Sequence, residues 1–188
     1  MRSFFAGLGL ALCSVATGAH AAAVIHAGLM DMHTHVTSEQ SRSAPLERFT
    51  KSEGDVAAHA HGAEGIRRAV RAGVDSIEHG TFMDDQTMKL MREKGTWCLP
   101  TISAGRWVYE KAQDPTCFPA MVTPRALAVG PQIQQTFARA WKAGVPIMFG
   151  TDCGVCEHGC NAKEFAYMVE AGMPALEAIK SATIVPAR

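Results

Sequence analysis

The sequence has no excess of charge of either sign and no apolar run long enough for a comfortable membrane span. Its 188 residues contain 18 Lys and Arg against 18 Asp and Glu, so the formal net charge is zero. This balance gives no reason to expect nucleic acid or a membrane surface as a partner. Internal repeats and low-complexity tracts are also lacking. Hydrophobic content of 47% and charged content of 19% are ordinary, and the length suits one globular domain.

The first residues predict an export signal. A positive start is followed by an apolar run at residues 4–15, which is too short to span a bilayer, and then by small residues at the positions that a signal peptidase reads. We expect cleavage after Ala21, with Ala23 as the second choice. The predicted organisation is a secretory signal at 1–21 and one domain at 22–188, in a periplasmic or secreted protein without a membrane anchor.

Export changes how the cysteines are interpreted. Five of the six remain after the expected cleavage, and because five is odd, at least one thiol is free or pairs between chains. A disulfide within the late cluster of three is one option, and a structural zinc site on that cluster with His158 is another. A metal-binding or redox module built there is therefore an alternative function. The five residues are Cys98, Cys117, Cys153, Cys156 and Cys160.

The rest of the chain alternates short apolar strands with helices, which is typical of an α/β fold with a parallel sheet. We expect the helix over 124–143 to be interrupted or kinked near Gly130-Pro131. In the helix over 162–171 we expect Lys163, Glu164, Tyr167 and Glu170 to form the polar set. The expected strands cover residues 56–59, 74–79, 97–100 and 145–149. The other expected helices cover residues 63–72, 86–94 and 174–183.

Polar side chains occur where the strand candidates end. His33 and His35 follow an apolar run and share one side of an extended strand, because residues two apart point the same way. His59, His79 and Asp152 each lie at the end of a further strand. In a parallel α/β barrel these ends line one mouth, where active sites are built. Four imidazoles and a carboxylate suit a divalent metal, Zn²⁺ first.

A metal at this mouth suggests hydrolysis. A catalytic zinc keeps one position open for water and lowers the pKa of that water toward roughly 7. Asp152 is placed to bind the metal, to take the proton and to return it to a leaving group. His61 shares a face with His59 and is either the ligand in its place or, as we favour, a group on the substrate side.

Four stretches resemble strand motifs of the metal-dependent amidohydrolase superfamily, in its branch of Xaa-Pro dipeptidases and imidazolonepropionase-like hydrolases. They look like its first, fifth, sixth and eighth strands, in the right order. The spacing of 20 positions from His59 to His79 also fits the family. The stretches are G-L-M-D-M-H-T-H at 28–35, V-A-A-H-A-H-G at 56–62, S-I-E-H-G at 76–80 and G-T-D at 150–152.

The resemblance implies a partial TIM-type barrel of about strands 1 and 5–8. His33 and His35 would bind the more buried metal, and His59 and His79 the more exposed one. Asp152 would serve as general base and then acid while hydroxide attacks an amide carbonyl that the metal polarises. The implied substrates are Xaa-Pro dipeptides or N-acyl amino acids, and the implied position of His158 at the pocket rim makes it a substrate contact.

The sequence also departs from the family. Only 24 residues separate His35 from His59, where the family has well over a hundred, so strands two to four and a carboxylated metal-bridging lysine are expected to be missing. One metal is then favoured over two. A complete barrel needs eight strands and roughly 250 residues. The alternatives are a second copy that completes the barrel, a rearranged fold, or a catalytically inactive remnant that still binds metal.

Overall fold

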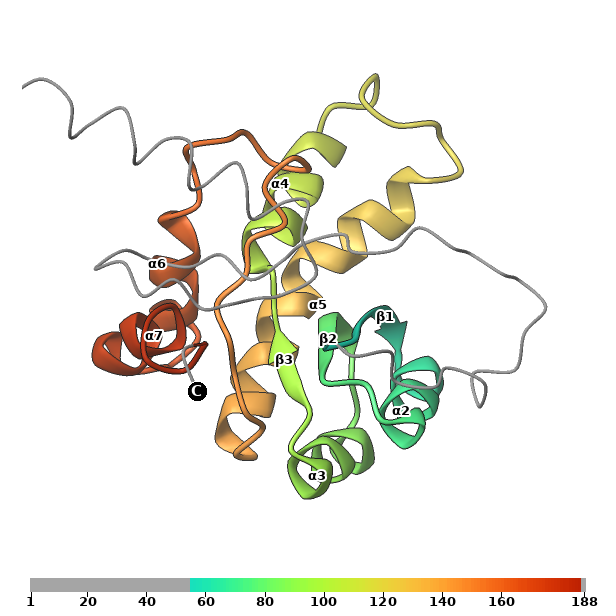
Figure 1. Cartoon of the computed structure of the whole chain (residues 1–188). Coiled ribbons are helices and arrows are strands. Elements are labelled where there is room, and N and C mark those ends of the chain that lie inside the picture. Colours follow the sequence, from blue (N-terminus) through green and yellow to red (C-terminus); the bar gives the residue numbers. More distant parts are fainter. Residues whose placement is uncertain (1–54, 187–188) are drawn as a thin grey trace, which may run out of the picture.

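A computed structural model of the chain describes residues 55–186, which form a small parallel sheet covered by helices (Figure 1). The predicted signal at 1–21 and the first-strand pair His33 and His35 lie outside the described residues. The strands are β1 (Ala57–Gly62), β2 (Ser76–Phe82) and β3 (Trp97–Leu99). The helices are α2 (Ala63–Ala72), α3 (Asp85–Lys94), α4 (Ile102–Ala112), α5 (Thr123–Lys142), α6 (Lys163–Glu170) and α7 (Ala175–Ser181).

The sheet is parallel throughout, in the order β1-β2-β3. The fourth strand, expected at 145–149, is present only as a single parallel bridge between Cys98 and Ile147. Two backbone hydrogen bonds make this bridge, from Cys98 N to Pro146 O (2.8 Å) and from Met148 N to Cys98 O (3.0 Å). Pro146 has a carbonyl to offer but no N–H, which limits a regular ladder here. The α/β fold class predicted from the sequence is confirmed.

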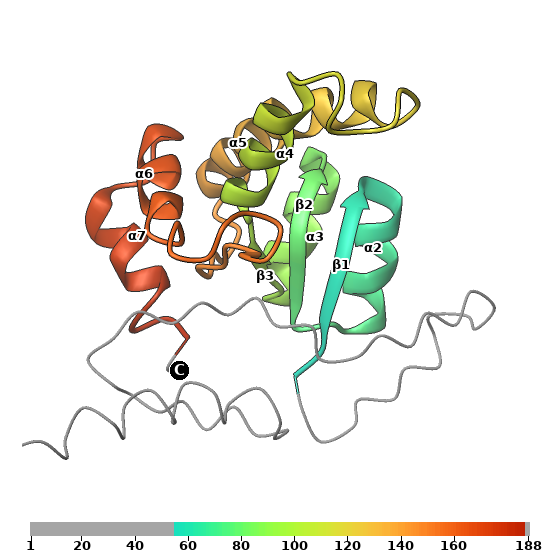
Figure 2. The ribbon, with the colours of Figure 1, turned by 90° about the horizontal axis from the view of Figure 1, so that it is seen from above.

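The core lies between the sheet and its helices. Figure 2 shows α2 beside β1, and α4 with α5 at the end where β2 points. Apolar side chains from most elements meet in one buried cluster, which explains why the alternating pattern folds as a unit. No helix among residues 55–186 has the length and apolar character to cross a membrane. The cluster includes Ile66, Ile77, Met91, Phe137, Val145 and Met168.

Glycine and aspartate set the ends of the first two helices, as their positions in the sequence indicate. Gly73 (φ 89°) and Gly95 (φ 71°) end α2 and α3 in the left-handed conformation that glycine adopts without a steric penalty. Asp84 is the N-cap of α3, where its carboxylate accepts hydrogen bonds from Thr87 N (2.8 Å) and Thr87 Oγ1 (2.6 Å). Arg67 of α2 adds a third donor to the same carboxylate (2.8 Å).

These three donors predict how stability depends on Asp84. They lower the pKa of its carboxyl from 3.8 to about 2, with the Thr87 hydrogen bonds as the largest cause. A lowered pKa adds stability that is complete above pH 4 and is lost as the pH falls toward 2. We expect Asp84→Ala to reduce the unfolding free energy by about 1 kcal/mol at pH 7, and by less at pH 2.5. Urea denaturation at both pH values measures this.

Asp85→Ala is the matched control, because the Asp85 side chain is 89% exposed and makes only a surface ion pair with Arg139. It should cost less than Asp84→Ala at pH 7. Equal losses in the two variants would contradict the capping role of Asp84.

The helix α4 was not expected from the sequence. The helix α5 is continuous through Gly130-Pro131, so of the two alternatives expected there, an interruption or a kink, the interruption is absent. Both differences come from the contact between the two helices. A Cβ on Gly130 would lie 2.4 Å from Tyr109 Cβ and 2.8 Å from Gly105 O, both in α4. The two glycines let the helix backbones approach closely, and glycine lowers the intrinsic helix propensity on which a prediction from sequence relies.

This close approach predicts that Gly130→Ala destabilises the protein by about 1–3 kcal/mol, because the added methyl group overlaps α4. The better helix propensity of alanine, worth up to about 1 kcal/mol, does not offset the overlap. Gly65→Ala in α2 is the control, since a Cβ there meets nothing within 4 Å; it should be neutral or stabilising. Thermal unfolding of the two variants measures the difference, and a Gly130→Ala variant as stable as Gly65→Ala would contradict the packing.

Candidate active site

Three histidines of β1 and β2 meet at the C-terminal ends of these strands. His59 Nδ1 lies 3.0 Å from His79 Nε2. The rings of His61 and His79 stack in parallel, with centroids 4.8 Å apart and 1° between their planes. His59 is exposed and His79 is half-buried, so a ligand can reach the cluster. The structure therefore brings together two of the four predicted metal-binding histidines and the predicted substrate-side histidine.

An unusual backbone conformation at His79 makes this meeting possible. The parallel register pairs His59 with Glu78 and Ala60 with His79. Because side chains alternate along a strand, a regular β2 would direct His79 to the side of Ala60, away from His59. Instead His79 has φ 72°, Gly80 has φ 60°, and the register shifts after Ala60. The left-handed turn places the His79 ring on the same side as His59.

Backbone strain is concentrated at this end of the sheet. Among the residues that the structure describes, three that are not glycine have positive φ: His79 (72°), Thr101 (48°) and Asp152 (53°). His79 lies within β2, Thr101 follows β3, and Asp152 follows the Ile147 bridge. Such conformations cost about 1–3 kcal/mol each and persist where the surroundings impose them, most often at functional sites. Their common location supports a site at this mouth.

Two threonine hydroxyls lie within hydrogen-bond distance of the rings. Thr101 Oγ1 lies 2.8 Å from His79 Nδ1, and Thr81 Oγ1 lies 2.8 Å from His61 Nδ1. We assign the proton to Nδ1 in both rings, with the hydroxyl oxygen as acceptor, so that each Nε2 carries a lone pair. For His79 this lone pair faces Nδ1 of His59. The pattern of a ring nitrogen held by an outer hydrogen bond is typical of metal-binding histidines.

The His59–His79 pair fits half of a metal site. Zinc binds imidazole nitrogens at about 2.0–2.1 Å, so two ligands of a tetrahedral ion lie roughly 3.3 Å apart. The observed 3.0 Å is close to this separation. Within residues 55–186, no group of three or more His, Cys, Asp or Glu side chains is arranged to hold a metal ion. The predicted partners His33 and His35 lie outside that range.

Asp152 lies close enough to the cluster to act on it electrostatically. Partial burial lowers the pKa of His61 below its usual 6.5, and the attraction of the Asp152 carboxylate opposes this shift without overcoming it. His61 is therefore neutral at pH 7. Thr151 holds the loop that carries Asp152. Its hydroxyl oxygen accepts hydrogen bonds from Cys153 N and from Asn161 Nδ2, both at 3.2 Å.

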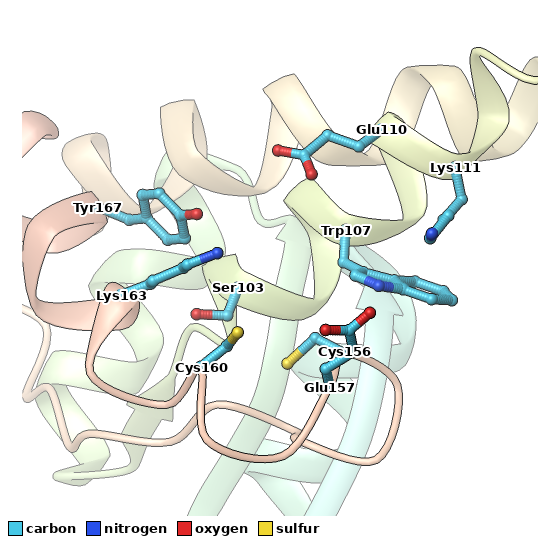
Figure 3. A pocket seen from close by; sticks show the side chains of 9 residues that line it. All are labelled: Ser103, Trp107, Glu110, Lys111, Cys156, Glu157, Cys160, Lys163 and Tyr167. Carbon is cyan, nitrogen blue, oxygen red and sulfur yellow. The ribbon is translucent and has the colours of Figure 1, made fainter.

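The loop after Asp152 holds His158 and the late cysteines. His158 is exposed there, and its substrate contact stays a prediction. Cys153 Sγ and Cys156 Sγ lie 2.9 Å apart as thiols, and burial raises the pKa of Cys156 to about 12. A cavity of about 170 Å³ lies between this loop, α4 and α6 (Figure 3). Its lining includes Trp107, Cys160, Lys163 and Tyr167 rather than the imidazole cluster.

The structure corrects the prediction for Glu164 and adds Thr101 to the site. Glu164 was expected in the polar set of its helix, but it is fully buried. Its carboxylate accepts hydrogen bonds from the first residues of α4, Ile102 and Ser103. Because these partners lie about 60 positions away in the chain, the local pattern of α6 contains no sign of them. Thr101 follows a proline after a three-residue strand and carries no motif of its own.

Comparison with known proteins relates this geometry to a family. The sequence profile of the amidohydrolase family matches residues 50–188. A solved Xaa-Pro dipeptidase with methionine bound in its active site is 62% identical, with a TM-score of 0.68. Ochratoxinase of Aspergillus niger is 34% identical over 139 residues, and its crystal structure matches with a TM-score of 0.62. A prolidase solved with N-methylphosphonate-L-proline is 32% identical, with a TM-score of 0.63.

These matches cover most of this chain but only part of each relative. They cover 69% of this chain and 32% of the Xaa-Pro dipeptidase, 70% of this chain and 30% of the ochratoxinase structure, and 71% and 32% for the prolidase. In sequence, ochratoxinase is covered over 28% of its length and this chain over 73%. The chain thus spans about a third of the length of its relatives, which confirms the predicted partial barrel.

Proposed function

Because the chain belongs to the amidohydrolase family, we propose that it is a metal-dependent hydrolase of amide bonds that acts on Xaa-Pro dipeptides or related N-acyl amino acids. One observation carries the proposal: His59 and His79, predicted from separate motifs, face each other at 3.0 Å, and the Asp152 carboxylate acts electrostatically on the neighbouring His61. The similarity to an Xaa-Pro dipeptidase and a prolidase favours dipeptides as the substrate class.

The chain's own residues have distinct tasks in this proposal. His59 Nδ1 and His79 Nε2 would hold the metal, with His33, His35 and Asp152 as further ligands. A bound divalent ion, Zn²⁺ first, supplies Lewis acidity that polarises the amide carbonyl and makes water more acidic. Asp152 takes a proton from the attacking water and returns it to the amide nitrogen as the C–N bond breaks.

The two predicted substrate-side groups, His61 and His158, have roles of their own in this proposal. His61 is neutral at pH 7 and is held by Thr81, so its Nε2 can accept a hydrogen bond from a substrate N–H. We propose that His158, on the exposed loop after Asp152, contacts the far end of the substrate. We also propose that residues 1–21 direct export to the periplasm or the medium.

A second candidate is a non-catalytic protein of the same descent that still binds metal. It is favoured by the sheet itself, which has three strands and one further bridge among the described residues, whereas a complete barrel of this type has eight. Association with a second copy is the proposed route by which such a sheet would be completed.

Hydrolysis of a dipeptide panel, with and without added Zn²⁺, tests the first candidate against the second. The panel pairs each Xaa-Pro dipeptide with its Xaa-Ala counterpart, and the mass of the purified particle is measured in the same buffer. We expect zinc-dependent cleavage that favours Xaa-Pro. A folded, metal-loaded protein that cleaves none of the dipeptides would establish the second candidate instead.

A further inference from the structure

We infer that Glu164 is a positioning residue of this site: it fixes Thr101, and through Thr101 it fixes the orientation of the His79 ring. The functional meaning of this inference rests on the proposed hydrolase, since His79 matters there as a metal ligand. Glu164 belongs to α6, outside every motif from which the site was predicted.

The contacts of Glu164 are those of a structural anion binding a helix terminus. Its side chain has no exposed surface. Oε1 accepts a hydrogen bond from Ile102 N (2.9 Å), and Oε2 accepts from Ser103 N (2.7 Å) and from Ser103 Oγ (2.6 Å). A buried carboxylate is costly unless several donors compensate it, and here two of them are the first N–H groups of α4, where the helix dipole also favours negative charge.

The reason for this arrangement is visible at the residue that precedes α4. Thr101 occupies the N-cap position, where a threonine hydroxyl ordinarily accepts from an N–H of the first turn. Its side chain makes no such capping bond here. Its Oγ1 instead lies 2.8 Å from His79 Nδ1. Glu164 supplies from another helix the cap that Thr101 does not provide.

Without the carboxylate, the hydroxyl of Thr101 would have two competing partners. Thr101 is held at φ 48°, a conformation that a β-branched residue adopts only under constraint. Loss of Glu164 would leave the N–H groups of Ile102 and Ser103 buried without an acceptor, which is unfavourable for each group. Relaxation of Thr101 toward an ordinary N-cap would satisfy one of them and would release His79 Nδ1.

The test uses the full chain without metal, with Glu164→Gln as the variant and Glu170→Gln as the matched control. Glu170 also links α6 to α4, through Arg106 (2.7 Å), but at a different turn and at the surface. Two readouts are taken: amide hydrogen exchange at Ile102 and Ser103, and the ring ¹⁵N chemical shifts of His79 at a pH where the ring is neutral.

In the wild type and in Glu170→Gln we expect slow exchange and one His79 tautomer, protonated at Nδ1. In Glu164→Gln we expect exchange at the two amides to be at least about 10-fold faster, since the amide group of glutamine turns one acceptor into a donor. The ¹⁵N shifts of His79 should move toward the average of the two tautomers. Wild-type shifts of His79 in Glu164→Gln would overturn the inference.

Two further variants keep the test decisive if Glu164→Gln does not fold. Ser103→Ala removes one of the three donors and should shift His79 in the same direction by a smaller amount; no shift would overturn the inference. Thr101→Val should reproduce the full change in His79, and adding Glu164→Gln to it should change His79 no further. An additional change would show that Glu164 acts by another route. An inactive chain with the expected shifts would overturn the proposed hydrolase and leave this inference standing.

Discussion

Replacing Asp152 by asparagine should lower kcat for a cleavable Xaa-Pro dipeptide by about 10²–10⁴-fold and leave the fold unchanged. The amide has nearly the shape of the carboxylate but cannot take a proton from water. The backbone at Asp152 has φ 53°, a conformation that asparagine tolerates at least as well as aspartate. The loss should therefore be chemical rather than structural, and steady-state kinetics with circular dichroism measure both.

Asp114→Asn is the control for this variant, because Asp114 is exposed and bonds only locally, to Thr116 and Cys117. It should leave kcat and KM unchanged. The pH profile adds a second criterion: the fall in activity at acid pH that a carboxylate base produces should be lost from the residual activity of Asp152→Asn. An Asp152→Asn variant as active as the wild type would remove Asp152 from the proposed mechanism.

The second large effect should be on metal content. Replacing both His59 and His79 by alanine removes the two facing nitrogens and should weaken Zn²⁺ binding by more than about 100-fold, beyond the 10–100-fold that the loss of an outer partner costs. Metal analysis per chain after dialysis measures this directly. For the wild type, chelation should abolish turnover and added Zn²⁺ should restore it.

Two comparisons sharpen the result. His158→Ala should keep the full metal content, since His158 lies on the exposed loop. The double variant His33→Ala/His35→Ala tests the other half of the predicted ligand set and should also lose metal. Wild-type loading in this double variant would contradict the first-strand assignment, and wild-type loading after loss of His59 and His79 would contradict the assignment of this pair as metal ligands.

Local sequence signals predicted the parts of the fold that depend on local physics. The helix over 63–72 has the expected bounds, because an apolar periodicity ends there at Gly73, whose left-handed conformation stops the helix. Asp84 marks the start of α3 for a similar reason, since its carboxylate bonds to an amide three residues away. These features depend on interactions within one turn of the chain, so the neighbouring residues contain the information that determines them.

The same local signals did not predict the features of the fold that depend on contacts between distant segments. The strand expected at 145–149 is a single bridge, since pairing depends on the position of Cys98 and on the carbonyl of Pro146. Glu164, which was expected in the polar set of α6, is buried, because the amides that bind its carboxylate come from another helix. Glycines at 105 and 130 weaken the helical pattern of α4 and α5 in the sequence but allow the two helices to pack.

For the site, the sequence predicted the residue types, imidazoles and a carboxylate at the ends of parallel strands, in an order that resembles the amidohydrolases. How the side chains face one another depends on the fold. A strand with regular alternation would have directed His79 away from His59, and it is the left-handed conformation at His79 that joins them. The sequence specifies the residue types, whereas the direction of a ring depends on a backbone angle that distant contacts hold in place.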